Sequence, residues 1–272
     1  IEVITPISMD HMAILGDTIA EIAVEKAGII KPNTIVVSAK QHIDAEKVLS
    51  ERCKSLGCEL RTVADKEIKV CSLGLRDQSF EYRDWHDVHI SLSGTYQFKN
   101  ASLAIMATEA LRDKGCDISD QAVYAGLKAA RWVGRFTQIA EAPAVIIDGA
   151  HNDGAAIALE DSVQQYFGDK KVILVIGIFK DKEYESVLAH LVPLAKQVIT
   201  VETPNSDRAL PADVLMEKAF RYSEHVEAAE SICKGMEAAH SYALQDDVIL
   251  VCGSLSFLGD VKQLVDRRRN NG

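Results

Sequence analysis

The sequence predicts an α/β protein with two domains, and three observations support this prediction. From residue 144 to residue 269, short β-branched apolar runs alternate with amphipathic helical stretches, which is typical of a mostly parallel sheet covered on both faces. Between residues 60 and 92 the apolar stretches are short and separated by polar turns, which indicates antiparallel strands. A chain of 272 residues is long enough for two hydrophobic cores.

The first half is expected to open with a buried strand at residues 1–7. Asp17 or Thr18 can cap a helix that runs to about Ala27, with Gly28 at its end. The other elements expected in this half are a buried strand at 35–37, a helix at 44–56, strands at 68–71, 80–82 and 88–92, and helices at 97–113 and 119–130.

The segment 131–136 interrupts the helical pattern and is the expected domain boundary. We therefore expect domains at residues 1–136 and 137–272. The second domain should contain strands at 144–147, 172–176, 197–201 and 248–251, and helices at 154–166, 183–195, 212–220, 227–243 and 258–269.

Composition excludes several classes of protein. The net charge of −10 argues against nucleic acid as a partner, and Arg267–Arg269 is the one basic cluster, which a solvated helix end also explains. No apolar run approaches the ~20 residues of a membrane span. Six scattered cysteines without a CxxC pair favour reduced thiols in a cytoplasmic protein. Because the chain opens inside an expected strand without a Met, we expect it to be part of a longer one.

Lys26 is the first candidate functional residue. Ile19, Ile22 and Ala23 form one apolar helix face, and Lys26 is the next position on that face. It either extends outward at the helix C-terminus or is desolvated and available for covalent modification or phosphate contact. The pair Asp10-His11 follows the first expected strand, where α/β sheets place ligand groups.

The second candidate is the turn Asp148-Gly149-Ala150-His151-Asn152 between a strand and a helix. A helix N-terminus favours anions, so His151 could bind a phosphate and Asp148 a ribose or a metal-bound water. A simple capped turn explains the same residues. Gln97 and Asn100 open another helix, and Arg135 lies in the expected interdomain link, where it is either exposed or reaches a ligand.

Six segments in order resemble the folylpolyglutamate synthase/dihydrofolate synthase family of the Mur-ligase superfamily. The resemblance covers nearly the whole chain, although no GxxxxGK[ST] phosphate loop is present. The segments are Ile4–His11 with Leu15–Thr18 and Glu25–Pro32, Tyr96–Ala101, Gly134–Phe136, Asp148–Asn152, Lys180–Lys182 and Gly253–Leu255.

The resemblance implies that residues 1–136 are the C-terminal part of a P-loop-type central domain. Residues 137–272 would then be a Rossmann-like glutamate-binding domain. It implies an enzyme that uses ATP to activate a folate γ-carboxylate, or dihydropteroate, as an acyl phosphate that L-glutamate attacks. His11 and a carbamylated Lys26 would bind Mg²⁺. Asn100, Arg135 and Asp148 would contact ATP, and His151 and Ser254 would place the glutamate. The enzyme would be a monomer that binds only small molecules.

Departures from the family pattern include Ser8, Tyr96, Asp153 and Ser256, and the last of these puts the details of acceptor binding in doubt. The alternatives are a Mur-type peptidoglycan-precursor ligase and a truncated, non-catalytic binding module. Since the phosphate loop of the family would lie upstream of Ile1, we expect the 272-residue chain alone to have no ligase activity.

Overall fold

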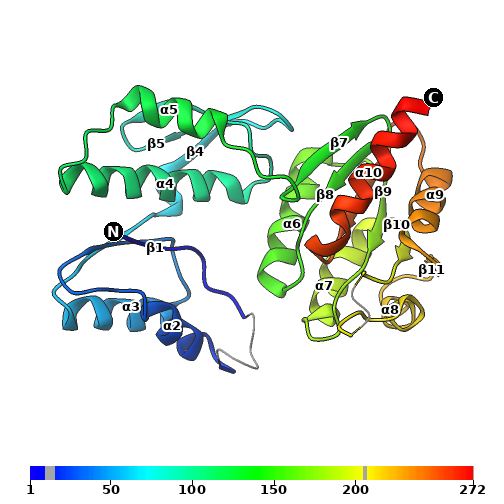
Figure 1. Ribbon diagram of the computed structural model, residues 1–272, viewed down its shortest axis with the longest axis horizontal. Helices are drawn as coiled ribbons and strands as arrows, with labels where there is room; N and C mark the ends of the chain where they lie inside the picture. Colours follow the sequence, from blue (N-terminus) through cyan, green and yellow to red (C-terminus); the bar gives the residue numbers. More distant parts are fainter. Residues whose placement is uncertain (10–15, 205–206, 272) are drawn as a thin grey trace. The chain divides into compact units, whose positions relative to one another are not determined.

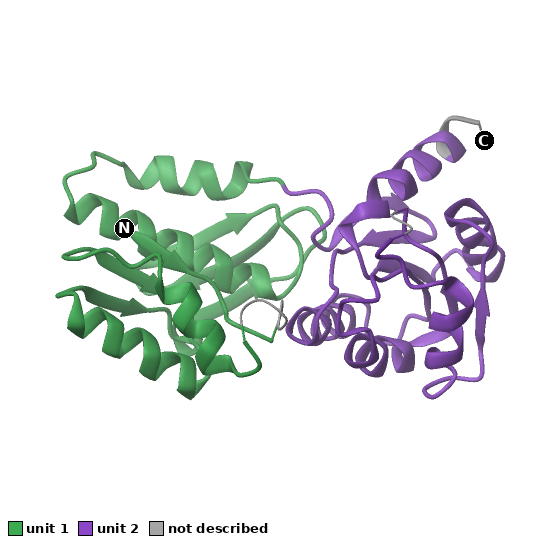
Figure 2. Cartoon of the chain, turned by 60° about the horizontal axis from the view of Figure 1, so that its bottom comes forward, with its two compact units in different colours: residues 1–131 green, residues 132–272 purple. Residues whose placement is uncertain are grey.

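The computed structural model describes residues 1–9, 16–204 and 207–271. The chain forms two compact units, residues 1–131 and 132–272 (Figure 2). Residues 132–136 thus belong to the second unit, not to the first as expected. The reason is Phe136, whose buried ring packs 5.1 Å from the ring of Tyr166 and 6.1 Å from that of Phe167.

A small parallel sheet organises the start of the first unit. Its strands, in spatial order, are β1 (Glu2–Ile4), β2 (Ile35–Ser38) and β3 (Glu59–Thr62), and the helices α2 (Ile19–Ala27) and α3 (Ile43–Ser55) pack against one face. β1 is shorter than the expected strand 1–7. The parallel direction of β3 corrects the antiparallel arrangement expected from residue 60 onward, because α3 crosses over between β2 and β3.

Helix α2 begins where the sequence predicts. The Thr18 side chain accepts the N–H of Glu21, whose own side chain returns to the Thr18 N–H, so that both groups satisfy helix-end donors. The buried residues of α2 are Ile22, Ala23 and Ala27. Lys26 is exposed, so the expectation that it lies on the inner face is wrong; Ala27 occupies that face instead.

The rest of the first unit is an antiparallel meander with two helices, as predicted. Helix α4 supplies buried residues to a core shared with the parallel sheet and the meander, and Figure 1 shows it between them. These elements are η1 (Asp65–Glu67), β4 (Ile68–Ser72), β5 (Gln78–Tyr82), β6 (Trp85–Ile90), α4 (Tyr96–Asp113) and α5 (Asp120–Ala129).

The second unit is a six-stranded sheet in the order β11-β10-β9-β12-β8-β7, in which only β7 runs antiparallel. The strands are β7 (Thr137–Glu141), β8 (Ala144–Ile147), β9 (Val172–Ile176), β10 (Ala195–Thr200), β11 (Val226–Ala228) and β12 (Val248–Cys252). The helices are α6 (Asp153–Phe167), α7 (Tyr184–Leu191), η2 (Val192–Leu194), α8 (Ala212–Ala219), α9 (Ile232–Tyr242) and α10 (Leu255–Asn271). The mostly parallel α/β fold that the sequence predicts is confirmed.

Two strands of the second unit, β7 and β11, were not expected. β7 falls next to the segment interpreted as a link, and its pairing with β8 is interrupted by a bulge between Gln138 and Ala140. β11 (Val226–Ala228) has only three residues, and its last two fall in the stretch predicted as the helix 227–243. The helix begins later, at Ile232, because the Ser231 side chain accepts the N–H of Lys234 and caps it.

The topology places a switch point at β12. The chain moves outward from β8 to β9, β10 and β11, then returns to insert β12 between β9 and β8. The connection before β12 therefore crosses the opposite face, where α9 and α10 pack on the sheet (Figure 1). Ligands of open α/β sheets bind outside the carboxyl ends of strands at such a point.

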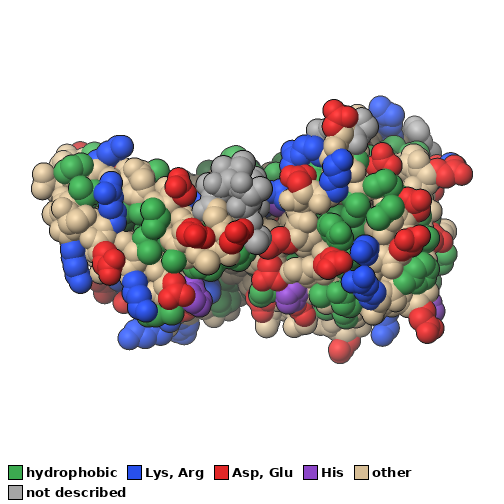
Figure 3. Space-filling view, turned by 90° about the horizontal axis from the view of Figure 1, so that it is seen from below, with side chains coloured by type: hydrophobic (Ala, Val, Ile, Leu, Met, Phe, Trp, Pro, Cys, Tyr) green, Lys and Arg blue, Asp and Glu red, His purple; other side chains and the backbone are tan. Residues whose placement is uncertain are grey.

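On the face shown in Figure 3, acidic and basic side chains are interspersed. None of the helices in residues 1–9, 16–204 and 207–271 is long and apolar enough to cross a membrane.

Candidate functional site

Three loops meet closely at the carboxyl ends of β8, β9 and β12. Gly253 has a φ of +108°, and a Cβ added there would lie 2.4 Å from the carbonyl oxygen of Gly177. A Cβ on Gly149 would lie 2.5 Å from the Leu255 side chain. The Gly149 N–H also donates to the Gly134 carbonyl at 2.9 Å. Glycines at these positions therefore let the loops approach to backbone contact.

Asp148 anchors this edge. Its side chain is 3% exposed, and its two carboxylate oxygens accept the N–H of Phe136 at 2.7 Å and the N–H of Ala150 at 2.8 Å. A carboxylate satisfied by backbone donors in this way fixes both its own turn and the segment before β7. The Asp148 carboxylate therefore holds the turn through backbone contacts, and its contact with a ribose or a metal-bound water stays a prediction.

We expect Asp148→Asn to lower the free energy of unfolding of the second unit by about 2 kcal/mol. The amide keeps one acceptor but points an NH₂ group at a buried backbone N–H, which then loses its partner. Hydrogen exchange of the β8 and β12 amides under native conditions measures the change. Asp169→Asn, on an exposed carboxylate of the same unit, is the matched control and should be neutral. Equal protection in the two variants would contradict the anchoring role.

His151 and Asn152 lie at the start of α6. The Asn152 side chain accepts the N–H of Ala155 at 2.9 Å and caps the helix. The Nδ1 atom of His151 lies 2.8 Å from the carbonyl oxygen of Gly149. Because a carbonyl oxygen can only accept, Nδ1 carries a proton, and Nε2 is an acceptor in the neutral ring. The half-buried His151 ring therefore has a defined orientation beside a helix N-terminus.

Ser254 is the matching residue at the start of α10. It is 5% exposed, its Oγ lies 2.8 Å from the Oγ of Ser256, and it accepts the Ser256 N–H at 3.2 Å. Ser254 follows β12 and His151 follows β8, so adjacent parallel strands deliver both to the same edge.

Arg135 belongs to the second unit. Its neighbours are fixed, since Phe136 binds Asp148 and the Gly134 N–H donates to the Thr137 hydroxyl at 3.1 Å. The Arg135 side chain is half-buried between these two anchored residues. The structure thus brings the Arg135 backbone, Asp148, His151 and Ser254 into one unit around one sheet edge.

A polar network beside this edge was not predicted. Asp153, the first residue of α6, accepts a short hydrogen bond from Ser186 of α7, and its carboxylate lies 3.5 Å from Nε2 of His190. His190 Nδ1 lies 2.8 Å from Glu160. The hydrogen-bonded partners are at least 30 positions apart in sequence. The available signal was the spacing of Ser186 and His190, which are four positions apart and therefore lie on the same side of α7.

A clamp holds the loops that follow β9 and β10. Arg208 makes two hydrogen bonds to Asp181, at 2.7 and 3.2 Å, and its guanidinium lies 4.4 Å from the centre of the Phe179 ring. The hydrogen bond from Arg208 lowers the pKa of the Asp181 carboxyl. At the end of β12, complete burial raises the pKa of the Cys252 thiol, so it is not an available nucleophile.

In the first unit, Lys26 lines a hollow of about 330 Å³ at the carboxyl end of β1. Glu25 and the chain from Val3 to Ile7 form the rest of it with Ile29. Asn100 is exposed in the first turn of α4, where its Nδ2 donates to Gln97 Oε1 at 2.9 Å. Asp10 and His11 lie outside the described residues.

The described part of the chain holds no cluster of three or more His, Cys, Asp or Glu side chains that could bind a metal ion. Lys26 becomes an oxygen ligand only if its amine is carbamylated. Among the residues that the structure describes, the expected magnesium site is therefore incomplete.

The chain is similar to known proteins over nearly its whole length. Residues 134–255 match the family model "Mur ligase, glutamate ligase domain". The chain is similar to the dihydrofolate synthase/folylpolyglutamate synthase of Bacillus subtilis, with 30% identity over 96% of this chain and 61% of that protein. It is similar to the folylpolyglutamate synthase of Lacticaseibacillus casei, with 29% identity over 97% of this chain and 61% of that protein.

Solved structures give the same result. The chain matches Mycobacterium tuberculosis folylpolyglutamate synthase, complexed with ADP and AMPPCP, with a TM-score of 0.85 and 29% identity over 97% of this chain and 63% of that one. It matches E. coli FolC in complex with DHPP and ADP with a TM-score of 0.83 and 27% identity, over 98% of this chain and 61% of that one. The chain spans less than two thirds of the length of each of these relatives.

Proposed function

The chain belongs to the folylpolyglutamate synthase/dihydrofolate synthase family of Mur ligases, and on that premise we propose that the protein containing it is an ATP-dependent amide ligase. It joins L-glutamate to the γ-carboxylate of a folate or to dihydropteroate through an acyl phosphate, and releases ADP and phosphate. The observation that carries the proposal is the turn 148–152, which lies at the sheet's switch point inside the matched glutamate ligase domain.

In the second unit, His151 and Ser254 bind the incoming glutamate. Both lie at the start of a helix, where backbone N–H groups and the helix dipole favour a carboxylate. The amine of the bound glutamate attacks the acyl carbon, the carbon–oxygen bond to phosphate breaks, and the amine loses a proton. The His151 ring is oriented through the contact of Nδ1 with the Gly149 carbonyl oxygen, and in its neutral form it can accept that proton at Nε2.

The nucleotide contacts are divided between Asn100, Arg135 and Asp148. Because both Asp148 oxygens already accept backbone N–H groups, its part is to hold the segment that carries Arg135. Arg135 then supplies a permanent positive charge to the phosphates.

Mg²⁺ and a carbamylated Lys26 complete the proposal, and the support for them is the resemblance to the family. Lys26 is exposed and lines the hollow with Glu25, so its amine is accessible to carbon dioxide. His11 is the second proposed ligand. A magnesium ion there would neutralise the phosphates of ATP.

An assay of the complete protein tests the function. With ATP and glutamate, we expect ADP release that depends on a reduced folate or on dihydropteroate. The two acceptors, measured separately, decide whether one or both are substrates. The 272-residue chain serves as the control and should give no turnover, because it contains no GxxxxGK[ST] motif. ADP release with a peptidoglycan precursor and with neither pterin compound would establish the Mur-type alternative instead.

A further inference from the structure

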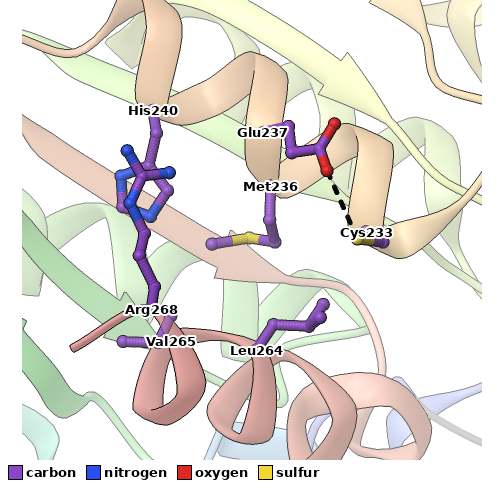
Figure 4. Close-up of a pocket in the computed structure, with 7 residues that line it drawn as sticks. All are labelled: Cys233, Met236, Glu237, His240, Leu264, Val265 and Arg268. Carbon is purple, nitrogen blue, oxygen red and sulfur yellow. Dashed lines mark hydrogen bonds between the residues drawn. The ribbon is translucent and has the colours of Figure 1, made fainter. Parts of the chain in front are cut away.

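The second unit contains a hollow that the proposed ligase reaction does not use. It has a volume of about 200 Å³ and lies between α9 and α10 (Figure 4). Helix α9 follows the carboxyl end of β11 and helix α10 follows that of β12, and both run back toward the amino ends of the strands. His240, in the last turn of α9, and Arg268, late in α10, therefore lie toward the edge opposite the turn 148–152.

The floor of the hollow is apolar. Met236 is 4% exposed and Val265 is 3% exposed, and Leu264 lies beside them. The hollow is smaller than the ~300–1,000 Å³ pockets that hold drug-sized ligands. An occupant must therefore have a small apolar body.

One end of the hollow is positively charged. In Figure 4 the His240 ring and the Arg268 guanidinium lie next to each other. Neither side chain makes a hydrogen bond or an ion pair to another residue in the described part of the chain. Burial and the nearby Arg268 lower the pKa of His240, so the ring is neutral at pH 7 and Arg268 carries the charge at this end.

The acid at the other end is already neutralised. Glu237 accepts a hydrogen bond from Lys234 at 2.8 Å, and the Cys233 thiol donates to the same carboxylate at 3.7 Å. Lys234 is the main cause of the lowered pKa of the Glu237 carboxyl, and the charge of Arg268 contributes least to it. The hollow combines an apolar floor with one cation, Arg268, that makes no hydrogen bond or ion pair with a carboxylate among the described residues.

We propose that this hollow binds a small monocarboxylate with an apolar body. The body lies on Met236, Leu264 and Val265, and the carboxylate pairs with the Arg268 guanidinium beside the His240 ring. An arginine fork matches a carboxylate in geometry as well as in charge. This inference does not depend on the proposed function.

Methyl NMR of the chain, labelled with ¹³C at its methionine methyl groups, tests the proposal with phenylacetate as the probe. We expect a saturable shift of the Met236 signal. Arg268→Ala should weaken binding at least about fivefold, since it removes a charge-assisted contact. The adjacent Arg267→Ala has the same net charge but lies outside the hollow, and should keep the affinity within about twofold.

A second probe separates charge from shape. Phenylacetamide has nearly the shape of phenylacetate but no charge, and should bind at least about fivefold more weakly. Three results would overturn the proposal: no saturable shift at Met236, equal affinity in the Arg267 and Arg268 variants, or equal affinity for acid and amide. Both arginines are exposed near the end of α10, so neither substitution threatens the fold.

Discussion

Replacing Lys26 by alanine in the complete protein is expected to lower turnover by at least about 100-fold. If the lysine is carbamylated, the substitution removes an oxygen ligand of the proposed magnesium ion, and a loss of about 3 kcal/mol of transition-state stabilisation corresponds to such a factor. ADP release at saturating ATP and glutamate measures turnover. Added formate or acetate should restore part of it by supplying the missing carboxylate.

The carbamate also has a signature that does not depend on activity. With ¹³C-labelled bicarbonate, the protein should give a carbamate carbon signal that Lys26→Ala removes. Lys31→Ala is the matched control, because Lys31 is also exposed, follows the same helix and does not line the hollow. Full turnover in Lys26→Ala, with no carbamate signal in the parent, would mean that Lys26 is only a solvated helix-end cation.

Gly253→Ala is expected to lower the free energy of unfolding of the second unit by about 3–5 kcal/mol. The residue has a φ of +108°, which a side chain strains, and the new Cβ would lie 2.4 Å from the Gly177 carbonyl oxygen. Because that atom belongs to the backbone, relief requires moving two adjacent strand ends. Urea unfolding, with hydrogen exchange of the β9 and β12 amides, measures the loss.

Gly259→Ala provides a control of opposite sign. Gly259 lies within α10, and a Cβ there meets no atom within 4 Å. Alanine should therefore stabilise the helix by about 0.5–1 kcal/mol. If both alanine variants had the same stability, the close approach of the loops at Gly253 would not matter for folding.

The elements that were predicted correctly are those whose signals are local. The Thr18 cap, the β-branched runs of β8, β9 and β12, and the alternation of β4 to β6 depend on neighbours in the sequence. β7 and β11 depend on pairing with distant strands, and three residues such as Val226–Ala228 have too little pattern to reveal one. The direction of β3 followed from its crossover helix and not from its own residues.

The candidate site, too, could be predicted only where its signals are local in the sequence. The positions of Asp148, His151 and Ser254 at strand ends follow from the alternation of strands and helices. The partners of Asp148 do not, because the Phe136 N–H is a backbone group that carries no side-chain signal. Lys26 was placed on the wrong face because a nine-residue helix allows more than one apolar stripe, and Ala27 competes with Lys26 for the buried position.

The two outer strands of the six-stranded sheet have a consequence for association between copies of the chain. β11 exposes a border of only three residues, and the bulge at Gln138 and Ala140 interrupts the regular backbone of β7. Intermolecular strand addition needs a long, flat run of unpaired N–H and C=O groups, and neither border supplies one. The apolar sheet of the second unit therefore offers few unpaired backbone groups to which another copy of the chain could add a strand.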